Sequence, residues 1–266
     1  MKALIRYVLN RLPYIGRLRK YFVEAGEWPP GHFHSPIPGR EEVLRYVQSA
    51  PLQRQARYSD VGEDKISLLD IQLNRQGQLD LLREFSRYYS EIPFSEQKSQ
   101  GCRYFYDQQC FHHADAVFHY SFLAHIKPKR IIEVGCGYSS AVILDAIDRA
   151  FDHRPQVTFI EPYPERLRSI FQPSDEGQVC LLEKKVQDVP LETFSALQAD
   201  DLLSIDSTHI MKVGSDLQFL IFEVLPRMPI GVYVHFHDVF WPFEYPAEWL
   251  ERGWYWNEDY FLRAFL

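Results

Sequence analysis

The sequence predicts an α/β fold in which a parallel sheet is covered by helices on both faces. Three observations support this prediction. An apolar strand runs into a glycine turn and a helix at residues 130–147. From residue 130 onward, short apolar strands alternate with helical segments. Such alternation is typical of parallel sheets, whose strands are joined by crossover helices. Acidic and histidine residues gather where these strands end.

The strand at residues 130–134 carries β-forming side chains and ends at Gly135. Gly135 and Gly137 permit a tight turn and a close approach of the backbone to a ligand. The segment 141–147 then reads as a helix, whose first N–H groups point at whatever lies over the turn. Glu133 stands two residues before the first glycine and is placed to reach over the turn towards a ligand. We interpret the turn as a cofactor site, and a tight structural corner is the alternative.

The segment before residue 111 has a different character. Residues 1–23 carry basic residues and no acid, with apolar residues at roughly helical spacing. This pattern fits either a helix packed on its own domain or a weak contact with a membrane surface. A proline-rich linker follows at 26–39, the stretch 66–73 is ambiguous, and 104–107 reads as a loop or short strand. Helices are predicted at 41–48, 77–89 and 115–126. We therefore divide the chain into a mainly helical or irregular extension, 1–110, serving as a lid or interface, and a cofactor-binding domain, 111–266.

The remaining strands are predicted at 157–161, 179–186, 201–206 and 231–236, with a helix at 211–225. Ligands of parallel sheets gather at the carboxyl ends of the strands. Polar residues occupy all of these ends, which indicates an active site there: Glu133, Glu161, Asp188, Asp206, His237 and Asp238.

The run Glu133-Val-Gly-Cys-Gly-Tyr-Ser139 resembles the first motif of class I S-adenosylmethionine-dependent methyltransferases. The resemblance implies a Rossmann-like sheet and S-adenosylmethionine as the cofactor. It extends through 35–38, 103–106, 205–249 and 256–265 to a bacterial branch of small-molecule and sugar O-methyltransferases. That family closes its sheet with antiparallel strands after the fifth strand. Here the chain is expected to lack these final strands.

The resemblance assigns cofactor roles to individual residues. Glu133, Gly135, Gly137, Ser139, Glu161 and Asp188 would bind S-adenosylmethionine, with Glu161 on the ribose and Asp188 on the adenine. Ser139 donates a hydrogen bond or caps the helix. A surface carboxylate without a ligand is the alternative for Glu161.

A second cluster would handle the methyl acceptor. His209 follows Asp206 by three residues, where related enzymes carry their general base, and histidine titrates near neutral pH. The alternative for His209 is a helix cap. Asp206 and Asp238 would assist catalysis. Asp206, His237 and Asp238 also match the positions that hold a divalent cation such as Mg²⁺ in related enzymes, although magnesium prefers oxygen ligands. The acceptor would be a small molecule or a saccharide hydroxyl.

Composition narrows the partners. The formal net charge of −7 argues against nucleic acid, which requires a basic face. The four cysteines include no Cys-x-x-Cys pair, which favours reduced thiols in a cytoplasm. No apolar run is long enough for a bilayer. A homo-oligomer is compatible with the sequence. Two other functions compete with methyl transfer: a catalytically inactive scaffold of the same fold, and a nucleotide-dependent oxidoreductase, against which Ser140 counts because a third glycine is expected there.

Overall fold

The computed structural model describes residues 28–58 and 71–266, and for 50–58 the backbone only. The predicted segment 1–23 and residues 66–70 of the ambiguous stretch lie outside the described residues. The chain forms two compact units: 28–58 with 245–255, and 71–244 with 256–266. No helix in the described ranges combines the length and the apolar character that a bilayer crossing requires.

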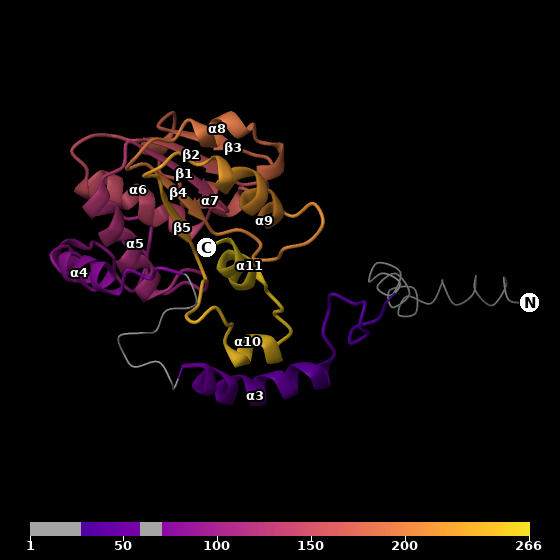
Figure 1. The fold of residues 1–266 in the computed structure, drawn as a ribbon. Helices are drawn as coiled ribbons and strands as arrows, with labels where there is room; N and C mark the ends of the chain where they lie inside the picture. Colours follow the sequence, from indigo (N-terminus) through magenta and orange to yellow (C-terminus); the bar gives the residue numbers. More distant parts are fainter. Residues whose placement is uncertain (1–27, 59–70) are drawn as a thin grey trace, which may run out of the picture. The chain divides into compact units, whose positions relative to one another are not determined.

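The first unit contains two helices that pack on each other (Figure 1), α3 (Arg40–Tyr58) and α10 (Ala247–Glu251). Helix α3 begins one residue before the predicted helix and continues ten residues beyond it, to Tyr58. Glu41 and Glu42 stand in its first turn, where carboxylates interact favourably with the helix dipole. The linker 28–39 is irregular, as predicted.

The second unit is built on a five-stranded parallel sheet with strand order β3-β2-β1-β4-β5. The strands are β1 (Arg130–Val134), β2 (Gln156–Ile160), β3 (Val179–Leu182), β4 (Leu202–Ile205) and β5 (Tyr233–Phe236). All five predicted strands are present, with β3 four residues shorter than expected. The sheet contains no antiparallel strand among the described residues. This is the Rossmann-like fold that the sequence predicts.

Helices cover both faces of this sheet (Figure 1). The α-helices of the unit are α4 (Arg75–Phe85), α5 (His113–Ile126), α6 (Tyr138–Ala150), α7 (Glu165–Ile170), α8 (Leu191–Ser195), α9 (Asp216–Phe219) and α11 (Glu258–Phe265). Shorter helical segments are η2 (Tyr89–Glu91), η3 (Pro173–Asp175), η4 (Val186–Asp188), the π-helix η5 (Leu220–Val224) and η6 (Leu225–Arg227).

The two faces of the sheet carry separate apolar clusters, because successive strand residues point to opposite sides. Ile131 packs with buried residues of α5, α6 and α7. Ile132 and Val134 pack with residues of α8 and η5 on the other face. The inner strands β1 and β4 are buried on both sides, as their near-continuous apolar runs predict, whereas the edge strand β5 is partly exposed.

The helix predicted at 211–225 begins later than expected, at Asp216. Ser215 caps it, because its Oγ accepts a hydrogen bond from the backbone N–H of Gln218 at 3.1 Å. Gly214 has a φ of +71°, which a helix cannot accommodate. Residues 206–215 therefore form a loop at the carboxyl end of β4.

A buried ion cluster ties the segment before α5 to the sheet unit. The guanidinium of Arg103 is 2.8 Å from both Asp145 and Asp148, and its Nε donates to Asp175 at 2.9 Å. The Arg103 side chain is only 1% exposed. Residues 71–110 consequently cluster with the sheet, which differs from the predicted domain boundary at residue 110.

We predict that Arg103→Ala lowers the free energy of unfolding by about 3 kcal/mol or more, because it leaves buried carboxylates without a partner. Urea denaturation of the purified chain measures this change. Arg154→Ala is the control, since Arg154 contacts the same Asp148 from the surface at 3.0 Å. It should cost less than about 1 kcal/mol. Equal losses in the two variants would contradict the assignment.

Candidate active site

The turn after β1 is constrained by the backbone that follows β4. Gly135 has a φ of +79°, and its N–H donates to the carbonyl oxygen of Ile160 at 3.1 Å. A Cβ at this position would lie 1.7 Å from the carbonyl oxygen of Asp206. No other residue type fits here without moving the backbone. The turn therefore brings the ends of β1, β2 and β4 together.

Gly137 is under weaker constraint. Its φ of −177° is ordinary extended backbone, and its N–H donates to Oγ of Ser140 at 3.0 Å. An added Cβ would lie 3.4 Å from the side chain of Arg166, an ordinary contact distance. Gly137 stands immediately before α6, so the predicted strand, turn and helix are all present.

A cavity of about 460 Å³ opens beside the glycine turn. Small-molecule sites have volumes of roughly 300–1,000 Å³, so the cavity is large enough for one. Three residues predicted to bind cofactor or acceptor line it, namely Gly135, Glu161 and Asp206. The remaining lining includes the apolar Ile160, Pro162 and Val186 and the polar Tyr163, Lys185, Gln187, Thr208 and Lys212.

Two backbone N–H groups hold the carboxylate of Glu161 beside the glycine turn. Its carboxylate accepts hydrogen bonds from the N–H of Cys136 at 3.0 Å and of Tyr163 at 2.8 Å. Each carboxylate oxygen retains further acceptor capacity. The side chain can therefore accept further hydrogen bonds while it stays fixed, and its contact with a ribose stays a prediction.

Glu133 differs from the expectation that it reaches over the turn. It is fully buried, and Ser140 donates a hydrogen bond to its Oε2. Burial raises the pKa of Glu133 to about 8, while hydrogen bonds from Ser140 and Ser139 act in the opposite direction. Its Oε1 has no hydrogen-bond partner. Glu133 thus lies beneath the turn, where it holds the start of α6.

Two other predicted cofactor residues lie outside the cavity lining. Ser139 is buried in the first turn of α6. Asp188 is exposed at the end of η4, whereas its neighbours Val186 and Gln187 line the cavity. Gln187 donates from its side-chain amide to the carbonyl oxygen of Gly214 at 2.8 Å. After β3, Gln187 therefore lines the cavity and Asp188 does not, and the adenine contact of Asp188 stays a prediction.

The ring of His209 is buried between the carboxylates of Asp206 and Glu258. Its Nδ1 is 2.7 Å from Oε2 of Glu258, and its Nε2 is 3.4 Å from Oδ1 of Asp206. Burial by itself would lower the pKa of His209, but the two carboxylates raise it to about 10. The imidazole is therefore protonated at neutral pH in the chain without ligands.

A separate histidine cluster lies on the α5 face of the sheet. The ring of His235 is 5.2 Å from that of His119 and 6.4 Å from that of His237. The two strand-end histidines share a face, as the strand period predicts. Burial lowers the pKa of His235 to about 4 and also lowers the pKa of His119 well below its usual value. The neutral form of the His235 and His119 rings is therefore favoured.

The predicted metal ligands do not form a metal site in this arrangement. Asp206 faces His209, whereas His237 is 3.5 Å from Asp238. Within residues 28–58 and 71–266, no three or more histidine, cysteine, aspartate or glutamate side chains are grouped to hold a metal ion. The divalent cation stays a prediction, and we derive no step through it.

Sequence reasoning missed several residues of the site. Glu258 has the closest contact with His209, yet it stands 49 residues away in the chain. Glu258 and Asp259 stand in the first turn of α11, where acidic residues are favourable in any helix, so no local pattern marks Glu258 as a site residue. Lys185 and Lys212 line the cavity. Both follow the ends of strands, where ligand contacts were predicted, so the same reasoning could have identified them.

Parts of the chain are similar to known proteins. Residues 132–239 match the family model described as a methyltransferase domain. An uncharacterized protein of Archaeoglobus fulgidus is 32% identical over 181 residues, which cover 66% of this chain and 76% of that protein. The crystal structure of the SAH-bound Podospora anserina methyltransferase PaMTH1 aligns with a TM-score of 0.40 and 16% identity. That alignment covers 75% of this chain and 87% of the fungal one.

We predict that Gly135→Ala destabilises the protein by about 2 kcal/mol or more, because the new Cβ collides with the Asp206 carbonyl and the positive φ disfavours alanine. Thermal or urea unfolding measures the change. Gly137→Ala is the matched control in the same turn and should lose less than half as much. The constraint would be refuted if both variants kept wild-type stability.

Proposed function

We propose that the chain, which belongs to the family of the archaeal relative and matches a methyltransferase-domain model at residues 132–239, is a class I S-adenosylmethionine-dependent methyltransferase that methylates a hydroxyl oxygen of a small molecule or saccharide. When bound, S-adenosylmethionine supplies an electrophilic methyl group on its sulfonium. The observation that carries the proposal is the position of Asp206. It lines the cavity beside the glycine turn and contacts His209 on its other side.

The residues around the cavity fit the proposed cofactor. Glu161 offers fixed carboxylate oxygens to ribose hydroxyls, and Gly135 lets the backbone come close to the ligand. Ile160, Pro162 and Val186 supply apolar surface suited to an adenine ring. Glu133, Gly137 and Ser139 would act indirectly, by holding the turn and the start of α6. Asp188 does not line the cavity, and its adenine contact stays a prediction.

Transfer to oxygen forms a C–O bond, breaks the C–S bond and leaves the electron pair on sulfur. The hydroxyl proton must also leave, and we assign its acceptance to His209. Its Nε2 faces Asp206 at the cavity, so a hydroxyl held by Asp206 would lie within reach. The two carboxylates raise the pKa of His209 to about 10 and so favour the protonated ring, and only the neutral ring can accept the hydroxyl proton. Asp238, near Asp206 and His237, would contact the acceptor.

Calorimetric titration with S-adenosylmethionine tests the cofactor assignment. We expect wild-type binding, and Glu161→Gln should weaken it by about tenfold or more, equivalent to about 1.4 kcal/mol. An amide nitrogen would face backbone N–H donors, and the ribose would lose a charged acceptor. Glu165→Gln, an exposed change outside the cavity lining, is the control. A well-folded wild-type chain that does not bind S-adenosylmethionine would favour the inactive scaffold.

A labelled-methyl assay over a panel of catechol and methyl glycosides tests the base. His209→Ala should reduce the turnover of the accepted compound by about a hundredfold or more, the range expected for a lost general base. The affinity for S-adenosylmethionine should stay within about threefold, since His209 does not line the cavity.

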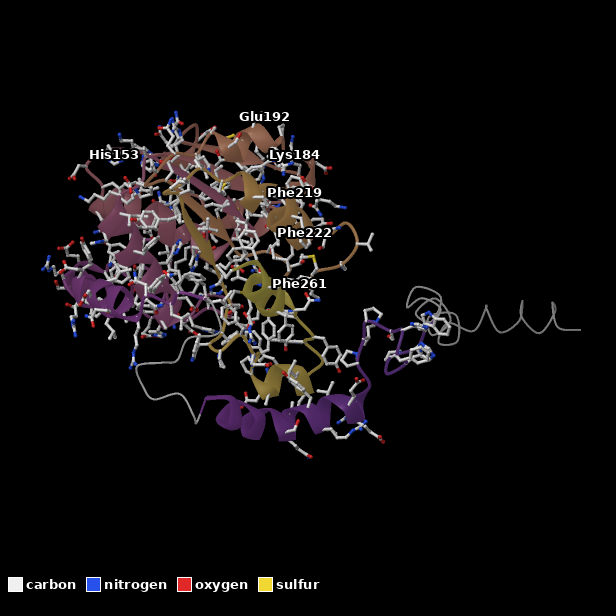
Figure 2. All side chains as sticks on the ribbon, viewed as in Figure 1. His153, Lys184, Glu192, Phe219, Phe222 and Phe261 are labelled. Carbon is white, nitrogen blue, oxygen red and sulfur yellow. The ribbon has the colours of Figure 1, made fainter. Side chains whose placement is uncertain are left out.

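The control for this substitution is His153→Ala, an exposed histidine on another part of the unit (Figure 2). It should leave turnover unchanged. Wild-type turnover in His209→Ala would remove the base assignment, and it would leave methyl transfer itself intact.

A further inference from the structure

Three consecutive residues at the start of α11 hold His209. The indole of Trp256 stacks on the imidazole with ring centroids 4.2 Å apart and an interplanar angle of 25°. The N–H of Asn257 donates to the carbonyl oxygen of His209 at 3.2 Å. The carboxylate of Glu258 lies 2.7 Å from Nδ1. The ring, the backbone and one ring nitrogen are thus each fixed by a different neighbour.

The segment also fixes the chain just beyond His209. The side chain of Asn257 accepts from the N–H of Met211 at 2.6 Å and donates to its carbonyl oxygen at 3.3 Å. His209 itself has a φ of +58°, a conformation that residues other than glycine adopt rarely. Such backbone persists only where the surroundings determine it, and strained positions cluster at functional sites.

Burial of the Glu258 carboxylate costs free energy that a purely structural contact does not require. It is 1% exposed, and its Oε1 has no hydrogen-bond partner. A buried ion pair adds little stability compared with apolar residues of the same volume. A helix that only needed to pack could carry an apolar residue at position 258. The charge therefore indicates a task for the carboxylate beyond packing.

The contact decides which nitrogen of His209 faces the cavity. A hydrogen bond to a carboxylate places the proton of that bond on Nδ1, because an ionised carboxylate only accepts. Nε2 then points to Asp206, whose side chain lines the cavity and is 30% exposed. A ring rotated by half a turn would present the wrong nitrogen to an acceptor hydroxyl.

We propose that Glu258 is a positioning residue for methyl transfer, which holds the His209 ring with Nδ1–H bound to its carboxylate and Nε2 directed to Asp206. This inference rests on the proposed function of His209. The positioning carboxylate is carried by α11, which packs against η5. The last helix of the described chain is therefore part of the active site as well as of the core.

Nitrogen NMR of the histidine rings is the first test, and it needs no acceptor. In the wild-type chain with S-adenosylhomocysteine, Nδ1 of His209 should show the shift of a protonated nitrogen bound to a carboxylate. His209→Gln identifies the signal by its loss. A wild-type His209 with its proton on Nε2 alone would overturn the proposal, whatever the variants do.

Substitution of Glu258 is the second test. Glu258→Gln is isosteric but cannot act as an anionic acceptor, and it should alter the Nδ1 signal. It should also lower kcat by about tenfold or more on whichever panel compound, catechol or methyl glycoside, the wild type methylates fastest. The KM for that compound and the affinity for S-adenosylmethionine should stay within about threefold. Glu258→Asp, which keeps the carboxylate, should recover part of the loss.

Asp259→Asn is the matched control on the same helical turn. Asp259 is buried as well, but it accepts from the N–H of Phe240 and has no contact with the His209 ring among the described interactions. It should leave kcat and the His209 signal unchanged. An unchanged kcat and an unchanged Nδ1 signal in Glu258→Gln would overturn the proposal. If the wild type methylates no panel compound, the proposed function fails, and the NMR comparison still decides whether Glu258 sets the ring.

Discussion

The close approach between the turn after β1 and the backbone of Asp206 is the constraint on which the site depends. The N–H of Asp206 donates to the carbonyl oxygen of Val134 at 2.9 Å, while the N–H of Gly135 donates to Ile160. These bonds continue the parallel ladders to both neighbours of β1. Only a glycine lets the two backbones come so close. The cavity opens where the ladders end, with Glu161 on one side of the turn and Asp206 on the other.

Buried charges do the remaining positioning, in two separate places. The cluster around Arg103 joins the segment before α5 to α6 and to η3. The pair of His209 and Glu258 joins the loop after β4 to α11. In both cases the ion pair fixes the relative position of residues that are far apart in the chain. A buried charged group without its partner would destabilise the folded protein. The first cluster lies away from the cavity and supports the fold, whereas the second touches the cavity through Asp206.

Sequence patterns were most informative where structure is local. The apolar runs located all five strands, and the run that resembles class I methyltransferases falls within residues 132–239, which match a methyltransferase-domain model. The patterns were less informative at segment ends. The helix expected from residue 211 begins at Asp216, since Gly214 and the Ser215 cap outweigh the apolar spacing of the following residues. The resemblance placed Asp188 at the adenine contact, yet Asp188 is exposed and the neighbouring Gln187 lines the cavity. A one-residue difference of this kind depends on how a short turn packs.

The sequence by itself determined the fold class, the glycine turn and the gathering of polar residues at the strand ends, because strand periodicity and glycine conformation are properties of neighbouring residues. Only the tertiary structure decided what these residues face. Glu133 is buried beneath the turn, although its place in the motif suggested contact with a ligand. His209 lies between Asp206 and a carboxylate from the last helix. The protonation of a histidine depends on the charges and the burial around it, and those are set by contacts between distant segments that no local pattern encodes.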